Sequence, residues 1–146
     1  MAKRILVPLD GAAPAEALIA AVADLARGAG ATVRLLHVAP VPDSVASEGR
    51  VVAYADQEAE RRKAEALDYL RGAELGLDGV AVEHGVRFGE PVAEIVKEAE
   101  AFDADLIAMF TRSAGFRRVV LGSVAEQVFR KAAPAVVLFR AGREAA

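Results

Sequence analysis

Short apolar runs alternate with stretches of helical periodicity along the whole chain, and this alternation restricts its fold more than any other feature. A strand followed by a helix, repeated four times and closed by a last strand, is typical of a parallel sheet with helices on both faces and right-handed crossovers. We therefore expect an α/β fold with an open five-stranded parallel sheet. The expected strands are residues 5–9, 32–38, 80–87, 105–110 and 135–139, and helical periodicity marks residues 18–25, 52–71, 92–99 and 123–131.

Length and composition favour one domain with a sizeable core. The chain has 146 residues, of which 54% are hydrophobic. It contains no cysteine, which excludes disulfides and is compatible with the cytoplasm, and no apolar run approaches the length of a membrane span. The net charge of −3 argues against a general nucleic-acid binder. We therefore expect a single cytoplasmic domain over residues 1–146 that binds neither nucleic acid nor membrane.

The two histidines do not have the spacing of metal ligands, so they predict no metal site. His84 falls on the same alternating face as Val82 and Val86, and this pattern predicts a half-buried strand histidine. The alternation over residues 80–87 also indicates a strand near a sheet edge, because a central parallel strand is usually apolar on both faces.

In open sheets of this kind, ligands bind at the carboxyl ends of the strands where the winding direction reverses. The first and fourth strands flank that point. They end in Leu9-Asp10 and in Met109, which is followed by an Arg-rich loop. A Gly-Ser pair then opens the last helix at Gly122, where unpaired N–H groups and the positive end of the helix dipole suit a phosphate. Three separate segments are therefore expected to converge on one site.

The start of the last helix can also satisfy itself without a ligand. Residues 123–126 fit a capping box, in which Ser123 caps the helix and Glu126 reaches back to it. Arginines in the preceding loop could hold an anion through paired hydrogen bonds, or they could form a solvated basic loop. These arginines are Arg112, Arg117 and Arg118.

Several segments, taken in order, resemble the universal stress protein family. Its members open with a short apolar strand ending in Pro-x-Asp, which Pro8-Leu9-Asp10 matches. Later blocks of the family are matched by residues 33–38, 89–91, 103–109, 121–126 and 134–138, so that the resemblance covers essentially the whole chain. It implies a Rossmann-like sheet of order 3-2-1-4-5 with the first strand at the centre. It also implies a dimeric regulatory or ligand-sensing protein.

ATP-binding members of the family carry a signature in which Gly-x-x-Gly follows the fourth strand and Gly-Ser or Gly-Thr comes after a further loop. This chain keeps only the end of that signature. Phe110 stands in place of the first glycine, Arg112 or Ser113 in place of the second, and the loop is one residue short. A phenylalanine neither takes positive φ freely nor lets a ligand approach the backbone as glycine does. The resemblance therefore implies that ATP or Mg-ATP binds weakly or not at all, with a slowly hydrolysing ATP switch as the alternative.

The resemblance also assigns roles to single positions. Asp10 is similar to the acidic residue that contacts adenosine, although an Asp here can equally organise the turn into the first helix. The backbone of Val38 resembles the adenine contact, or it is an ordinary strand end. The candidate contacts for an adenine nucleotide or a small anion are Pro8, Leu9, Asp10, Val38, Met109, Arg112, Gly122, Ser123, Val124 and Ala125.

Motifs for catalysis are absent from the sequence. It lacks Gly-x-Ser-x-Gly, His-Glu-x-x-His and Walker A patterns. A phospho-receiver would need a second acid beside Asp10 and a lysine after the fifth strand, and Gly11 and Arg140 occupy those places. We therefore do not expect an enzyme.

The last strand points to self-association. Ala135-Val136-Val137-Leu138-Phe139 is apolar throughout, and in the family's strand order it lies at an edge of the sheet. A bare apolar edge invites pairing with another chain. We therefore expect a homodimer in which two copies pair these strands antiparallel about a two-fold axis.

Overall fold

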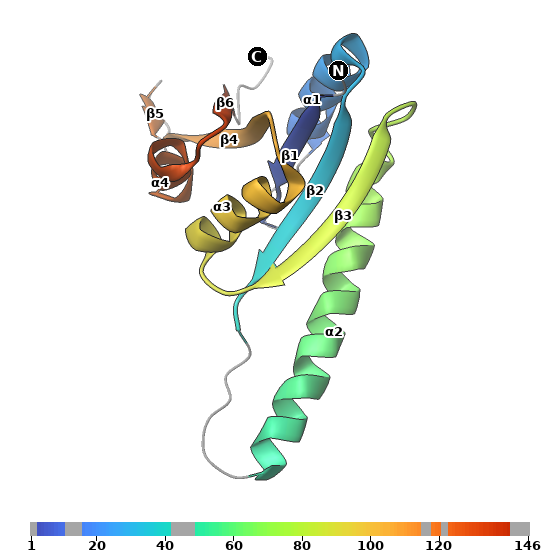
Figure 1. The fold of residues 1–146 in the computed structure, drawn as a ribbon, viewed down its shortest axis with the longest axis vertical. Helices are drawn as coiled ribbons and strands as arrows, with labels where there is room; N and C mark the ends of the chain where they lie inside the picture. The colour runs from blue at the N-terminus through green and yellow to red at the C-terminus, as the bar shows by residue number, and fades with distance from the viewer. Residues whose placement is uncertain (1–2, 11–15, 42–48, 115–117, 121–122, 141–146) are drawn as a thin grey trace.

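The computed structural model describes residues 3–10, 16–41, 49–114, 118–120 and 123–140, with only the backbone described at 49–55, 111–114, 118–120, 123 and 140. Strands and helices alternate as the sequence predicts, with one additional short strand before the last helix (Figure 1). The strands are β1 (Arg4–Pro8), β2 (Thr32–Ala39), β3 (Ala81–Phe88), β4 (Leu106–Ala114), β5 (Arg118–Val120) and β6 (Ala135–Arg140). The helices are α1 (Glu16–Ala29), α2 (Gly49–Glu74), α3 (Pro91–Phe102) and α4 (Ser123–Lys131).

A parallel sheet runs through the molecule in the order β3-β2-β1-β4-β6. β1 lies at its centre, between β2 and β4, and β6 pairs with the outer side of β4. This is the expected order 3-2-1-4-5, in which β6 is the fifth parallel strand, so the prediction of the fold class is confirmed. Within the described residues, β3 and β6 are the two edge strands of this sheet.

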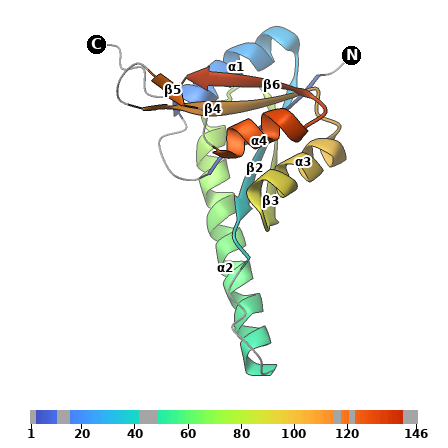
Figure 2. The ribbon, with the colours of Figure 1, turned by 90° about the vertical axis from the view of Figure 1, so that its left-hand side faces the viewer.

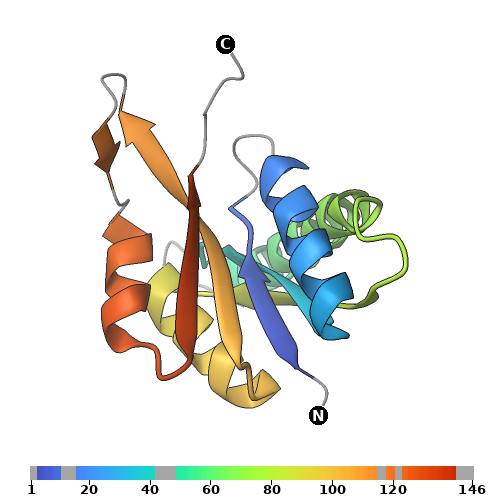
Figure 3. The same cartoon turned by 90° about the horizontal axis from the view of Figure 1, so that it is seen from above.

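Two helices cover each face of the sheet (Figure 3). Ile5 and Val7 belong to the core cluster shared with α1 and α2, whereas Leu6 between them belongs to the cluster shared with α3 and α4. All three residues are fully or almost fully buried. An apolar residue at every position of β1 is therefore explained, because a strand covered on both faces has no solvent side.

The third helix has clear start and stop signals. The side chain of Glu90 at the N-cap accepts a hydrogen bond from the backbone N–H of Val92, and Pro91 lies in the first turn, where its missing N–H has no helical partner to lose. The helix ends at Asp103, whose φ of 57° and ψ of 49° place it in the left-handed region typical of helix C-caps. These signals fix which residues of α3 face the sheet.

The second helix is longer than its sequence periodicity predicts, beginning at Gly49 and not Val52 and ending at Glu74 and not Arg71. Its first half extends past the end of the sheet, while its second half packs against it (Figure 2). His84 of β3 is half-buried beside this helix, with Nε2 2.6 Å from Oε1 of Glu74. The prediction of a half-buried strand histidine is confirmed.

The segment after the fourth strand differs from the expected loop. β4 does not end at Phe110 but continues to Ala114, and β5 pairs with this extension antiparallel. Figure 3 shows the resulting hairpin beyond the end of the parallel sheet. Val119 and Val120 are β-branched and favour an extended backbone, which explains a strand where the arginines suggested a solvated loop.

Candidate functional site

β1 and β4 are parallel neighbours in the sheet, as the predicted switch point requires. Ile5 and Leu6 of β1 are in register with Leu106 and Ile107 of β4, so both strands run toward the same edge of the sheet. From there the chain turns to α1 on one face and, by way of the β4–β5 hairpin, to α4 on the other. The end of β1 and the part of β4 beside it therefore lie at the edge where open α/β sheets bind ligands, while β4 itself continues to Ala114.

Four of the predicted contact residues meet in one apolar cluster. Met109 and Ala125 are buried, with 8% and 4% of their surface exposed, and the partly buried Val38 and Val124 pack against the same cluster. Their side chains belong to the core between the sheet and the helices α3 and α4. A ligand at this crevice would therefore meet these residues through their backbone groups.

The first strand ends at the half-buried Pro8, and Leu9 and the exposed Asp10 follow it. The backbone N–H of Leu9 donates to the carbonyl oxygen of Leu36 at 2.8 Å, which carries the sheet pairing one residue beyond β1. The side chain of Leu9 is buried in the cluster on the α1 and α2 face, and the partly buried Phe110 packs against the same cluster.

The remaining predicted contacts lie partly outside the described residues. Gly122 and Arg117 lie outside them, and for Ser123 and Arg112 only the backbone is described. The backbone of Arg112 pairs with Val120 in the hairpin. The prediction that Arg112 and the helix start bind an anion stays a prediction.

Of the two residues in the predicted capping box, the structure describes the side chain of Glu126 but not that of Ser123. Oε1 of Glu126 accepts a hydrogen bond from Nη2 of Arg130 at 2.7 Å, one turn further along α4. The carboxylate is thus engaged toward the C-terminal end of the helix, in an exposed pair of the kind that adds little stability.

A second feature, which the sequence did not predict, lies on the α1 and α2 face of the sheet. It is a hollow of about 410 Å³, and we call it the α2 pocket. Its lining from the end of β2 consists of His37, Ala39 and Pro40. Its lining from α2 consists of Arg62, Glu65, Ala66 and Tyr69. The signal that could have found it is positional, because His37 shares an alternating face with Val33 and Leu35, while residues 62, 66 and 69 share one helix face.

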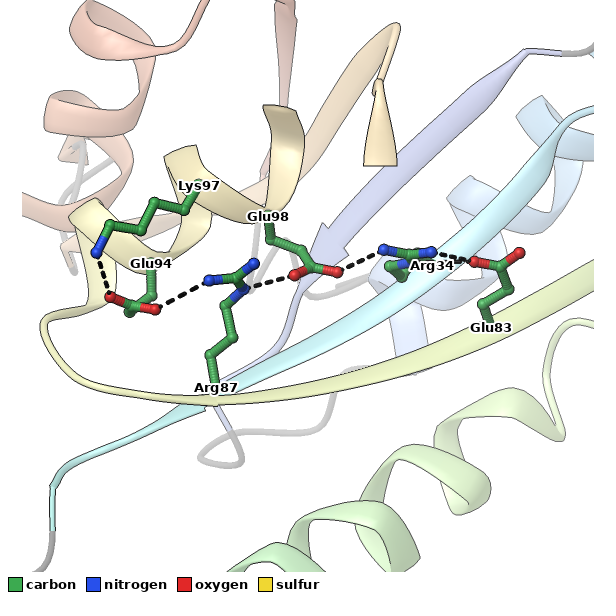
Figure 4. Close-up of polar contacts among 6 residues, drawn as sticks. All are labelled: Arg34, Glu83, Arg87, Glu94, Lys97 and Glu98. Atoms are coloured by element: carbon green, nitrogen blue, oxygen red, sulfur yellow. Dashed lines mark hydrogen bonds and ion pairs between the residues drawn. The ribbon is translucent and has the colours of Figure 1, made fainter. Parts of the chain in front are cut away.

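A network of ion pairs lies on the other face of the sheet, which α3 and α4 cover (Figure 4). Glu98 of α3 is 7% exposed and accepts from Nη1 of Arg34 at 2.6 Å and from Nε of Arg87 at 2.5 Å. Arg34 also pairs with Glu83, and Arg87 with Glu94, which in turn pairs with Lys97. The network therefore connects β2, β3 and α3.

Burial and ion pairing shift the pKa of Glu98 in opposite directions. Burial alone would raise the pKa of its carboxyl, but the hydrogen bonds from Arg87 and Arg34 outweigh burial and hold that pKa below the ordinary value of 4.5. The guanidinium of Arg34 also stacks on the ring of Phe102 at 4.2 Å. Because each charge in this network is paired with an opposite charge, its role is to connect elements.

Among the described residues, no group of three or more His, Cys, Asp or Glu side chains is placed to hold a metal ion. Over the same residues, none of the helices combines the length and the apolar character that a membrane crossing requires.

Comparison with known proteins identifies the family. The family model described as "Universal stress protein family" matches residues 1–140. The chain is 34% identical over 145 residues to a universal stress protein of Methanothermobacter thermautotrophicus, covering 96% of this chain and 97% of that one.

Solved structures of universal stress proteins share the fold of this chain. Universal stress protein UspA from Lactobacillus plantarum superposes with a TM-score of 0.75 at 22% identity, over 94% of this chain and 97% of that one. The universal stress protein from Archaeoglobus fulgidus in complex with dAMP superposes with a TM-score of 0.59 at 25% identity, over 93% and 96%. On the strength of the family match, the close relative and the shared strand order, the chain belongs to the universal stress protein family.

Proposed function

We propose that this protein is a cytoplasmic, single-domain regulatory module that senses a ligand in the stress response, acts as a homodimer and is not a turnover enzyme. We further propose that it binds ATP weakly or not at all. The observation that carries the second statement is the β4–β5 hairpin, which stands where ATP-binding members of the family have the glycine signature.

The hairpin matters because it engages the backbone. Arg112, Ser113 and Ala114 are in register with Val120, Val119 and Arg118 of β5. Antiparallel pairing uses backbone N–H groups for cross-strand hydrogen bonds. N–H groups engaged in that way cannot also surround a phosphate, as the amides of a glycine-rich loop do.

The side chain of Phe110 also argues against tight ATP binding. It packs against the core cluster that contains Leu9, and it is in register with Phe139 of β6. A glycine at this position would have no side chain in that cluster, and a ligand could approach the backbone of β4 more closely than it can beside an aromatic side chain.

The second candidate function is a nucleotide switch that hydrolyses ATP slowly. Its support is the parallel pairing of β1 with β4 at the switch point, together with the Archaeoglobus fulgidus relative that was solved with dAMP. On this alternative, an adenine nucleotide or a small anion would contact the backbone of Val38 and the N–H groups of Ser123 and Val124, with Arg112 beside them.

Titration calorimetry with Mg-ATP separates the two functions. We expect no binding at low micromolar concentration for the wild-type protein. Phe110→Gly alone should not restore tight binding, because the hairpin still engages the neighbouring amides. A saturating low-micromolar isotherm for the wild type would contradict weak ATP binding and favour the switch. Mass spectrometry of small molecules released on denaturation would then identify the ligand that the protein carries.

The proposed dimer rests on the exposed side of β6. The strand pairs with β4 on one side, and residues 136–139 are half-buried and apolar. Phe129 of α4, the helix that precedes β6, is a further large apolar side chain that is 57% exposed. Two copies related by a two-fold axis would bury Ala135, Val136, Val137, Leu138 and Phe139 of each chain.

A further inference from the structure

The pairing between β1 and β2 ends at a side-chain hydrogen bond. The last ladder partners are Pro8 and Leu36, and the N–H of Leu9 donates one more bond to the carbonyl oxygen of Leu36 at 2.8 Å. The next bond of a parallel ladder would run from the N–H of Val38 to the carbonyl oxygen of Leu9. Within the described residues, neither the strand register nor the backbone hydrogen bonds include that bond. The ladder therefore stops although both of its next partners are present.

The imidazole of His37 takes the place of the missing backbone donor. Its Nδ1 lies 2.8 Å from the carbonyl oxygen of Leu9. Because a carbonyl oxygen only accepts, Nδ1 carries the hydrogen in this bond. The ring of Tyr69 on α2 meets the imidazole edge to face, with 6.1 Å between the ring centroids and 67° between the planes. This contact favours the ring orientation in which His37 binds the carbonyl.

The backbone of Val38 is directed toward the side of β1, where that strand has ended. Successive residues of a strand turn their N–H and C=O groups to opposite neighbours. The carbonyl oxygen of Leu36 accepts from the β1 side, and that of Ala39 accepts from the N–H of Gly89 at 2.9 Å on the β3 side. Val38 therefore has the orientation of Leu36. Its N–H group needs an acceptor from outside the ladder, because backbone donors are rarely left without a partner.

We propose that His37 is a positioning residue for the ligand site at the carboxyl edge of the sheet. By binding the carbonyl oxygen of Leu9, it keeps this oxygen from the N–H of Val38 and leaves that N–H for an acceptor atom of a ligand. This role rests on the ligand-sensing function proposed above and adds a side chain that was not among the predicted contacts. A ring nitrogen of a nucleobase is an acceptor of this kind, so dAMP is a suitable probe.

Two variants of nearly equal size test this role without a ligand. His37→Asn keeps a side-chain N–H donor for the carbonyl of Leu9, whereas His37→Leu has none. We expect the amide of Val38 to exchange with solvent deuterium at similar rates in the wild type and in His37→Asn. In His37→Leu the carbonyl of Leu9 becomes available to this amide, which should exchange about tenfold more slowly. Equal rates in the two variants would overturn the proposal.

The other histidine of the chain provides the matched control. His84 contacts Glu74 and lies on β3, so His84→Leu should leave the exchange of the Val38 amide unchanged, and slower exchange there would overturn the proposal. If His37→Leu does not fold, the wild type decides. We expect nitrogen NMR to show the proton on Nδ1 of His37 and the Val38 amide to exchange faster than its paired neighbours on β2. A proton on Nε2 alone, or an equally protected amide, would overturn the proposal.

A dAMP titration followed by NMR separates this role from the proposed function. We expect dAMP to shift the Val38 amide of the wild type and of His37→Asn at about millimolar concentration, and to bind His37→Leu about tenfold more weakly. Equal binding by a folded His37→Leu protein would overturn the proposal. No binding by the wild type would contradict a nucleotide as the ligand, whereas the exchange rates of Val38 would still decide the role of His37.

Discussion

The two edge strands of the sheet, β3 and β6, differ in the side chains that they carry. β3 carries Glu83, His84 and Arg87, and each of these pairs with a charged partner on β2, α2 or α3. β6 is apolar until Arg140. Charged side chains are a common means of keeping an edge strand from pairing with another chain. β3 carries them along the strand, whereas the charged residue of β6 stands only at its last position. The difference indicates that the charged side chains of β3 disfavour pairing with another chain, whereas the edge at β6 is suited to pairing with a second copy.

The largest effect is expected at the centre of the network beside β3. Glu98→Ala removes the carboxylate shared by Arg34 and Arg87 and leaves both guanidinium groups partly buried without it. We expect the free energy of unfolding to fall by about 2 to 3 kcal/mol, the usual loss when a charged hydrogen-bond partner is removed. Urea denaturation measures this.

The matched control for that variant is Glu100→Ala, which changes an exposed carboxylate two residues along α3. We expect its stability to change by about 0.5 kcal/mol or less, as at most surface positions. Equal effects of the two substitutions would show that the network beside β3 contributes no special stability.

The next effect concerns association through β6. Val137→Lys places a charge in the proposed dimer interface, and we expect dimer affinity to fall by about tenfold or more, which is about 1.4 kcal/mol. Light scattering at tens of micromolar should show a dimer for the wild type and a monomer for the variant, with thermal melts confirming that the variant is folded.

The other edge provides the control for this substitution. Ala81→Lys introduces the same charge at an exposed position of β3 and should leave association unchanged. A wild-type protein that is monomeric at these concentrations, or a Val137→Lys protein that dimerises like the wild type, would refute the β6 interface. Loss of the dimer in Ala81→Lys would instead assign association to the β3 edge.

The smallest effect is a pH dependence of the network. Because pairing lowers the pKa of Glu98 in the folded state, the folded protein holds fewer protons there than the unfolded chain. The stability from this carboxylate is thus fully present above the ordinary pKa of 4.5 and is lost as pH falls through the lowered value. We expect wild type and Glu98→Gln to differ in unfolding free energy at neutral pH and to converge in acid. A difference that stays constant over the acid range would exclude this ionisation as its source.

The sequence predicts the fold well because the fold depends on local patterns that repeat. A short apolar run such as residues 5–9 predicts a strand, and apolar residues at helical spacing predict a helix. The preference for right-handed crossovers then restricts how these elements connect. The edge position of β6 followed from the strand order of the family that the chain resembles. The structure confirms that order and that edge.

The missed features depend on residues that meet only in three dimensions. No sequence pattern marks Arg34, Arg87 and Glu98 as partners, and the network exists because α3 crosses β2 and β3. The α2 pocket arises where Tyr69 and Ala66 pass over the end of β2. The hairpin was hidden because arginines are typical of loops, while its strand pairing depends on partners on both sides of the turn.

The central place of β1 has a consequence for how the molecule resists force. The chain enters the sheet at Arg4 in its middle strand and leaves it at Arg140 in an edge strand, and both strands run in the same direction beside β4. Tension between the two ends would therefore slide β1 and β6 along β4 in opposite directions. Parallel hydrogen bonds under such shear carry load together instead of opening one after another, so forced unfolding would have to pass a barrier that involves β4 along much of its length.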